Sequence, residues 1–170
     1  MKNLEIKAKC GSLSELRERV QTLGAACHGT MRQVDTYFRV PNGRLKLREL
    51  GDTHAELIYY ERPNQSGLRY SNYQICEIAD AASFKTLMLN ALTARVVVEK
   101  QRELWMYGDT RIHLDDVVGL GAFVELETVM RGQTEHDAYT EHDYVRTALD
   151  IQASAVVSVS YSDLLLSMQA

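Results

Sequence analysis

Basic side chains recur at every second position in two separated segments of this 170-residue sequence. Arg44, Lys46 and Arg48 alternate with leucines, and Lys100 and Arg102 repeat the spacing later in the chain. Alternate residues of a β-strand point to one face of its sheet, so we expect each set to share a face. Arginine forks and lysine point charges on neighbouring strands would match the row of oxygens in a triphosphate.

Acidic side chains show the same two-residue spacing. Carboxylates supply the hard oxygen ligands that Mg²⁺ and Mn²⁺ prefer. A divalent cation held by them would neutralise the phosphates and polarise the reacting phosphorus or its nucleophile. The acidic residues are Glu5, Asp115, Glu125 and Glu127; Lys7 shares a face with Glu5, and Arg111 and His113 share one with Asp115.

These alternating segments have two structural interpretations. In the first, the charged faces of an antiparallel sheet lie in water around an apolar core. In the second, the charged faces converge inside a barrel, and helices cover the apolar faces outside. Charged side chains are rarely buried unless they are paired or liganded, so the second interpretation requires a highly charged ligand. Composition and periodicity do not choose between the two.

The elements that would position these side chains follow from the apolar pattern and the turn signals. Helices are predicted over residues 13–23, 81–92 and 135–149, with about one further helical turn near 160–166. Ser12 and Glu15 form a capping box before the first helix, and Gly24 is a natural stop after it. Tyr161 and Leu164 are interpreted as docking the last helix. Strands are predicted over residues 4–10, 25–40 (one strand or two), 44–49, 55–62, 73–78, 95–107, 110–118 and 123–130.

Composition excludes several classes of protein. The chain is 45% hydrophobic and 25% charged, which is ordinary for a globular domain, so we expect one domain over residues 1–170. No run reaches the roughly 18 apolar residues of a membrane span, and no apolar signal segment is present. A net charge of −4 gives no general attraction to nucleic acid or membrane. We expect a cytoplasmic protein, and a homodimer is compatible with the sequence.

Five segments resemble, in order along the chain, the motifs of the CYTH family, also called triphosphate tunnel metalloenzymes. Residues 3–7 resemble its ExExK signature, 33–38 its QxDTYF segment and 45–49 its LRxR strand. Residues 97–102 resemble its VxKxR strand, and 114–127 its LDxVxGLGxFxExE stretch. Asn3 departs from the pattern because it replaces the first glutamate, which would weaken metal binding.

The resemblance implies an α+β fold that is mostly antiparallel β, with an eight-stranded closed tunnel barrel, a charged interior and helices packed outside. It implies Mg²⁺ or Mn²⁺ as the cofactor and a triphosphate in the tunnel. Lys7 and Tyr37 would orient the nucleophile. The implied phosphate ligands are Lys7, Lys46, Arg48, Arg62, Lys100, Arg102 and Arg111. The implied metal ligands are Glu5, Asp115, Glu125 and Glu127.

Three functions are compatible with this resemblance. The first is that of a class IV adenylate cyclase, which converts ATP into cyclic AMP and pyrophosphate. The second is a phosphohydrolase acting on inorganic tripolyphosphate or thiamine triphosphate. The third is a domain that binds a nucleotide or polyphosphate without turnover, which the loss of a carboxylate at Asn3 motivates. In each case the partner is a small-molecule nucleoside triphosphate or polyphosphate.

Overall fold

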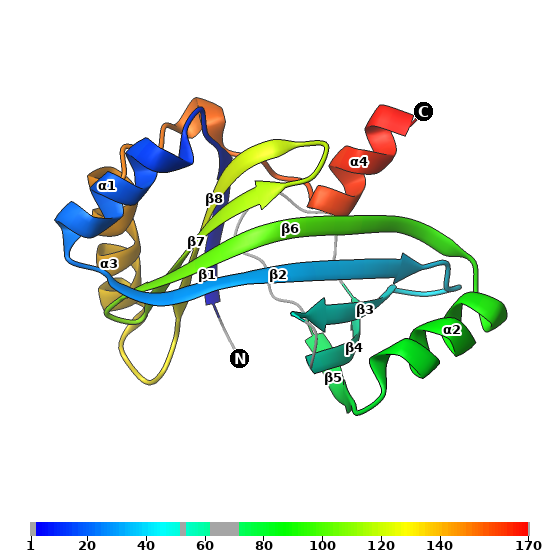
Figure 1. Cartoon of the computed structure of the whole chain (residues 1–170). Helices are drawn as coiled ribbons and strands as arrows, with labels where there is room; N and C mark the ends of the chain where they lie inside the picture. The colour runs from blue at the N-terminus through cyan, green and yellow to red at the C-terminus, as the bar shows by residue number, and fades with distance from the viewer. Residues whose placement is uncertain (1–2, 52–53, 62–71, 170) are drawn as a thin grey trace.

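The computed structural model describes residues 3–51, 54–61 and 72–169 (Figure 1). Within these ranges the strands form one eight-stranded antiparallel sheet in the order β1-β8-β7-β6-β2-β3-β4-β5. The strands are β1 (Asn3–Lys9), β2 (Ala26–Phe38), β3 (Arg44–Leu50), β4 (His54–Glu61), β5 (Asn72–Ile78), β6 (Ala94–Tyr107), β7 (Thr110–Val117) and β8 (Gly121–Val129). The helices are α1 (Leu13–Leu23), α2 (Ala81–Ala91), α3 (Glu135–Ala148) and α4 (Tyr161–Gln169), with a short 3₁₀ segment, η1 (Ala153–Ala155).

The predicted α+β, mostly antiparallel fold is confirmed, with one local difference. Residues 26–38 form a single strand, one of the two predicted alternatives, whereas α4 spans nine residues rather than about one turn. The first helix has the predicted ends. The Ser12 side chain accepts a hydrogen bond from the Glu15 amide, and Gly24 follows the helix with a φ of 84°, a backbone conformation that favours glycine.

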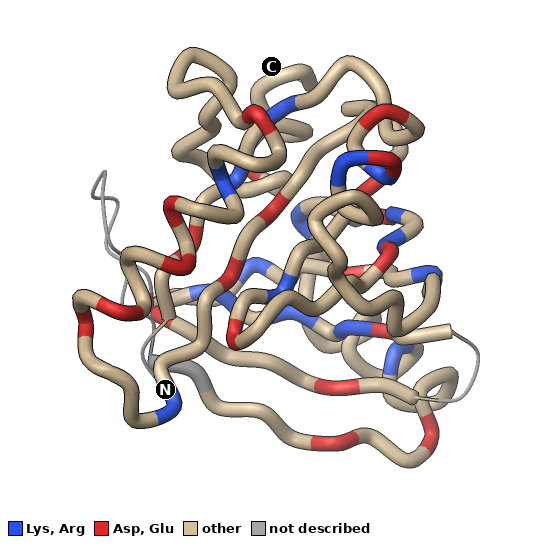
Figure 2. Tube along the Cα trace, turned by 90° about the vertical axis from the view of Figure 1, so that its left-hand side faces the viewer, with Lys and Arg blue, Asp and Glu red and all other residues tan. Residues whose placement is uncertain are grey.

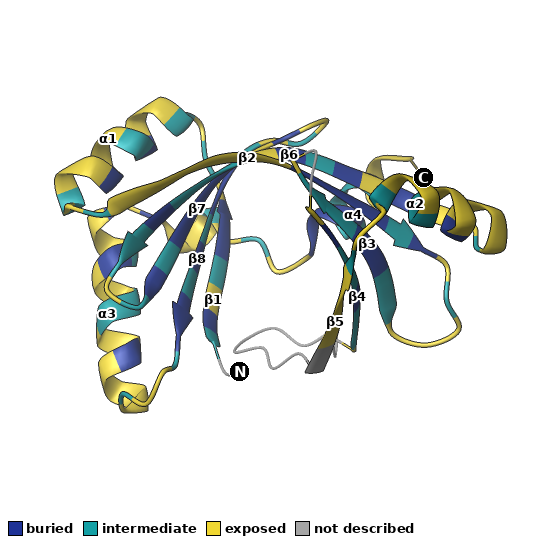
Figure 3. Ribbon diagram, turned by 60° about the horizontal axis from the view of Figure 1, so that its bottom comes forward, coloured by how far each residue is buried: buried dark blue, intermediate teal, exposed yellow. Residues whose placement is uncertain are grey.

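The sheet curls into the wall of a barrel, but hydrogen bonds among its described residues do not close it. Within the described residues β5 pairs with β4 alone, whereas the free edge of β1 carries one bridge, from Ala8 to Val156. Figure 3 shows β1 and β5 facing each other across the open side. The predicted closed barrel is therefore wrong in this detail. The curled sheet surrounds a cavity of about 590 Å³ lined by long charged side chains.

The apolar face of the sheet points outward, where helices cover it. Ile112 and Leu126 are fully buried in a core that also includes Leu16 and Val20 of α1 and Val145 of α3. Burying such side chains stabilises the fold by about 1.5–3 kcal/mol each. Helix α2 covers a second, smaller core on the other side of the molecule (Figure 3). The structure therefore has the second of the two arrangements considered for the alternating segments.

Helix α4 packs at one end of the curled sheet, beside the turn between β7 and β8 (Figure 1). A third apolar cluster, of Val98, Val117, Phe123 and Tyr161, fills this end. No helix in the described part of the chain is long and apolar enough to cross a membrane.

Candidate active site

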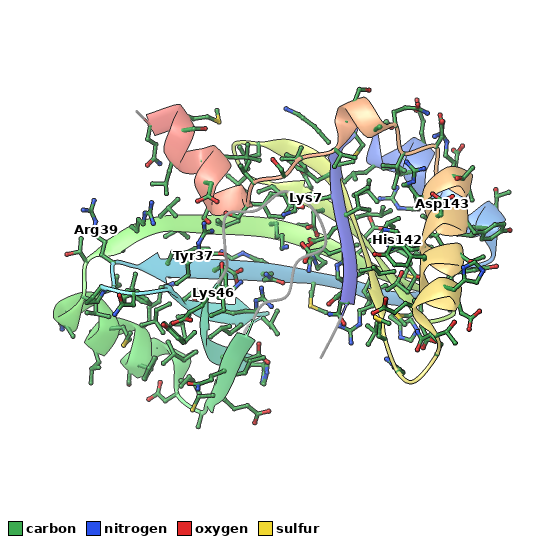
Figure 4. The ribbon with its side chains drawn as sticks, turned by 180° about the vertical axis from the view of Figure 1, so that it is seen from behind. Lys7, Tyr37, Arg39, Lys46, His142 and Asp143 are labelled. Atoms are coloured by element: carbon green, nitrogen blue, oxygen red, sulfur yellow. The ribbon has the colours of Figure 1, made fainter. Side chains whose placement is uncertain are left out.

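The inward face of the sheet lines one cavity with charged side chains from most of the strands. Figure 2 shows lysine and arginine positions gathered in the middle of the molecule, and Figure 4 places Lys7, Tyr37 and Lys46 there. Lys7, Lys46 and Lys100 are only 8%, 7% and 4% exposed. Lysines this deeply buried require anionic partners.

A first cluster joins β2 and β3. Asp35 Oδ2 accepts a hydrogen bond of 2.6 Å from Lys46 Nζ, and Arg48 donates to both carboxylate oxygens at 2.9 and 3.1 Å. Asp35 and Arg48 are direct cross-strand neighbours. Burial alone would raise the pKa of Asp35, but Lys46 and Arg48 outweigh it and hold that pKa well below its usual range. We call Asp35, Lys46 and Arg48 the first clamp.

A second cluster repeats this arrangement on β6 and β7. Arg102 donates to both oxygens of Asp115 at 2.7 and 2.6 Å, and Lys100 Nζ donates to Oδ2 at 3.1 Å. Arg102 and Asp115 are again direct cross-strand neighbours, and the lysine again lies two residues before the arginine. We call these three residues the second clamp. Two equivalent sets of cations are therefore held ready on two strands.

Burial lowers the pKa of the lysine in both clamps. Burial, with the nearby positive charge of Arg102, lowers the pKa of Lys100 to about 7, although Asp115 and Glu125 favour the charged form. The free protein therefore holds Lys100 near the midpoint of its titration at neutral pH. An added anion beside Lys100 would favour its protonated form.

The remaining predicted site residues lie on β1, β7 and β8. Lys7 is opposite Glu125, and Glu5 is opposite Glu127 across the β1–β8 pair. Glu125 accepts a 2.7 Å hydrogen bond from Arg102, which links it to the second clamp. Glu127 accepts hydrogen bonds from Asn3 and from the half-exposed Arg111. Arg62, another predicted phosphate ligand, lies outside the described residues.

The four predicted metal ligands do not form one cluster. Within the described ranges, no group of three or more His, Cys, Asp or Glu side chains is arranged to hold a metal ion. Both oxygens of Asp115 already accept hydrogen bonds from the second clamp, and Oδ2 also accepts one from Tyr161. Glu5 and Glu127 fit the role of metal ligands better than Asp115 does. Carboxylates directly opposite each other repel, and Mg²⁺ is commonly bound by one or two carboxylates together with substrate phosphates.

Two tyrosines complete the wall at the α4 end. Burial and the charge of Asp35 raise the pKa of Tyr37 to about 12, so its hydroxyl stays protonated at neutral pH. Tyr161 lies with its ring centroid 4.3 Å from Lys7 Nζ and 5.0 Å from Lys100 Nζ. Its hydroxyl donates to Asp115. Tyr161 was expected to dock the last helix, and it does, but it also contacts the charged residues of the cavity.

His113 lies in the cavity wall, in agreement with its predicted place on the charged face that it shares with Arg111 and Asp115. Burial and then the charge of Arg102 lower its pKa to about 3, so the ring is neutral at physiological pH. Its Nδ1 atom has no hydrogen-bond partner among the described residues. The alternation in β7 places His113 on the charged face, but only the folded structure shows how deeply it is buried.

Comparisons with known proteins agree with this architecture. The chain is 25% identical to a Methanocaldococcus jannaschii protein named "putative adenylate cyclase", over 96% of this chain and 98% of that protein. The PH1012 protein of Pyrococcus horikoshii has the same fold, with a TM-score of 0.83 and 19% identity over 95% of this chain and 98% of that one. A Hippeastrum adenylyl cyclase homologue, described as having a dominant triphosphatase activity, superposes with a TM-score of 0.74 and 12% identity over 99% and 96% of the two chains. The CYTH domain model matches residues 1–154, and the chain belongs to the CYTH family.

Proposed function

We propose that the protein is an enzyme that binds a nucleoside triphosphate in this cavity and cleaves the triphosphate with the help of a divalent cation. The observation that carries the proposal is the pair of matched clamps, each with a buried lysine and an arginine on one strand. A triphosphate offers several anionic oxygens in a row, and two clamps on one wall can hold adjacent phosphates by charge-assisted hydrogen bonds. Membership of the CYTH family supports the same class of substrate.

Charge balance supports a requirement for a divalent cation. Among the described residues, six basic side chains line the cavity, namely Lys7, Lys46, Arg48, Lys100, Arg102 and Arg111. Five carboxylates from the same part of the chain border it, namely Glu5, Asp35, Asp115, Glu125 and Glu127. The described wall therefore carries about one net positive charge, too little to neutralise a bound triphosphate. We propose that Glu5 and Glu127 hold Mg²⁺ or Mn²⁺ together with the phosphates.

The chain's own residues would act mainly by positioning and by charge. Lys46, Arg48, Lys100 and Arg102 would bind phosphate oxygens and fix the orientation of the triphosphate. The metal would supply charge neutralisation and polarise the phosphoryl oxygens. Lys7 would orient the attacking oxygen, and Tyr37, protonated at neutral pH, would donate a hydrogen bond rather than act as the base.

Two reactions fit this cavity. In the cyclase reaction, the ribose 3′-oxygen bonds to the α-phosphorus, the bond to the bridging oxygen breaks, pyrophosphate leaves and the hydroxyl proton passes to solvent. The Methanocaldococcus jannaschii relative, matched over nearly its whole length, supports this reaction first. In the hydrolase reaction, the water oxygen bonds to the terminal phosphorus, the bond from that phosphorus to the bridging oxygen breaks, and the diphosphate part of the substrate leaves. The attacked phosphorus becomes orthophosphate, and the water proton passes to solvent. The description of the Hippeastrum homologue supports this second candidate.

Product identification separates the candidates. Purified protein would be incubated with ATP, tripolyphosphate or thiamine triphosphate, each with Mg²⁺ or Mn²⁺ and with a chelator control. Cyclic AMP with pyrophosphate indicates the cyclase, and orthophosphate indicates the hydrolase. The Lys46→Ala and Arg102→Ala variants must lose the product, which excludes a contaminating enzyme. Saturable binding without any product would contradict the proposed catalysis and leave a binding domain.

A further inference from the structure

Three apolar side chains line the cavity beyond the two clamps. Met31, Leu50 and Leu104 come from β2, β3 and β6, which are neighbouring strands. Met31 pairs with Arg102, and Gln33 pairs with Leu50, so Met31 is the diagonal neighbour of both leucines on one face of the sheet. We call Met31, Leu50 and Leu104 the apolar patch.

The apolar patch lies away from the end that α4 fills. Tyr37 lies near that end and is linked to Ser162 of α4, whereas Met31 is six residues earlier on the same strand, about 20 Å along it. On β6 the inward face runs from Lys100 through Arg102 to Leu104, about 13 Å in all. On β2, β3 and β6 the cavity wall therefore changes along its length from charged to apolar.

The apolar patch does not contribute to the fold's cores. None of its three residues belongs to the apolar clusters of the described chain, and Met31 is 37% exposed. Across the same cavity, Ile58 and Ile75 form a cross-strand pair, and Ile75 is 50% exposed. Apolar surface left open in a cavity is a typical feature of ligand sites, where a few charged groups fix the ligand's orientation.

We propose that the apolar patch binds the organic group of the substrate, a flat heterocycle such as a nucleobase, with the triphosphate directed toward Tyr161. This inference rests on the proposed function and adds to it the residues that bind the organic group and the orientation of the substrate in the cavity. Inorganic tripolyphosphate has no apolar surface to bury against the patch. A heterocycle does, and Met31 can contact an aromatic ring through its flexible, polarisable thioether.

The test compares ligands that share a triphosphate and differ in their organic part. ATP, thiamine triphosphate and inorganic tripolyphosphate would each be titrated by calorimetry into the wild type and into a double variant that carries Met31→Ser and Leu104→Ala. The matched control is Leu87→Ala, which removes an exposed leucine on the outer helix α2. Because Leu104 is partly buried, Met31→Ser alone is a second variant, and thermal unfolding checks that both remain folded.

We expect the double variant to bind ATP, thiamine triphosphate or both about tenfold more weakly, and tripolyphosphate within about twofold of the wild type. Equal effects on all three ligands, or none, would overturn the inference, while tripolyphosphate binding by the wild type would still support the proposed function. If the wild type binds none of the three, the proposed function fails, and the inference fails with it.

Discussion

The hydroxyl of Tyr161, at the start of α4, donates a 2.9 Å hydrogen bond to Asp115 Oδ2 in the second clamp. The last helix is thereby attached to the charged wall of the cavity rather than to the outer surface alone. The same ring lies close to Lys7 and Lys100, so one side chain contacts the acid and both lysines at that end.

Replacing Tyr161 should separate the effect of its hydrogen bond to Asp115 from the effect of its ring contacts with Lys7 and Lys100. Tyr161→Phe removes the hydrogen bond to a carboxylate and should lower the free energy of unfolding by about 1.5–3 kcal/mol. Tyr161→Ala also removes the ring from the lysines, and we expect a larger loss together with weaker tripolyphosphate binding. Urea unfolding and calorimetry measure the two effects. Tyr139→Phe, at a 43% exposed position, is the control. If Tyr161→Phe had the same free energy of unfolding as the wild type, the stabilising role of the Tyr161 hydroxyl would be contradicted.

Asp35 is the buried anionic partner of two cations in the first clamp, Lys46 and Arg48. Asp35→Asn leaves Lys46 and Arg48 without their buried partner and should cost roughly 3–5 kcal/mol of stability. Tripolyphosphate can supply the missing negative charge, so it should raise the melting temperature of this variant more than that of the wild type. Asp143→Asn, which breaks an exposed pair with Arg146, should change little. Equal ligand-induced shifts in Asp35→Asn and the wild type would be evidence against the clamp.

The lowered pKa of Lys100, about 7, predicts a pH dependence of binding. Above pH 7 Lys100 loses its proton in the free protein. In the complex, the negative charge of the bound polyanion keeps Lys100 protonated. The complex therefore holds more protons, and affinity must fall as pH rises from about 7 to 9, by up to about tenfold per pH unit. Lys100→Arg stays charged throughout, so the ratio of its tripolyphosphate affinity to that of the wild type should rise over this range. The ratio cancels the ligand's own titration, and a constant ratio would disprove the prediction.

Asn3 donates a hydrogen bond to Glu127, one of the two proposed metal ligands. Asn3→Glu replaces that donor with a third carboxylate beside Glu5 and Glu127. Without divalent cations the added repulsion should lower the melting temperature, and Mg²⁺ or Mn²⁺ should restore it and bind more tightly than to the wild type. Asn90→Glu, on the exposed face of α2, is the charge-matched control. If the divalent cation raised the melting temperature equally in Asn3→Glu and Asn90→Glu, position 3 would not be part of the metal site.

Much of the fold follows from the sequence because alternation and capping act locally. The Ser12 cap and Gly24 fix both ends of α1, and the two-residue period identifies the faces of β3, β6 and β8. The direction of those faces could not be predicted from the period alone. It depends on which helices cover which side, and that is a property of the whole chain.

The parts of the site that depend on strand register could not be predicted. Asp35 lies in a segment that the family resemblance identified, yet its partners follow from its register with Arg48, which is 13 residues away. The only local signal was the repeated spacing of Lys46 with Arg48 and of Lys100 with Arg102. Tyr161 is 46 residues from Asp115, and no local pattern indicates that they meet.

The central claim is that the buried cations of the cavity bind a triphosphate. Calorimetric titration of tripolyphosphate into the wild type, Arg48→Ala, Lys100→Ala and Arg32→Ala tests it most directly. Arg32 pairs with Glu99 on the outer face of the same sheet and serves as the matched control. We predict saturable binding by the wild type, at least about tenfold weaker binding by Arg48→Ala and by Lys100→Ala, and little change for Arg32→Ala. Equal affinities in all four proteins, or loss of binding in Arg32→Ala alone, would contradict the account.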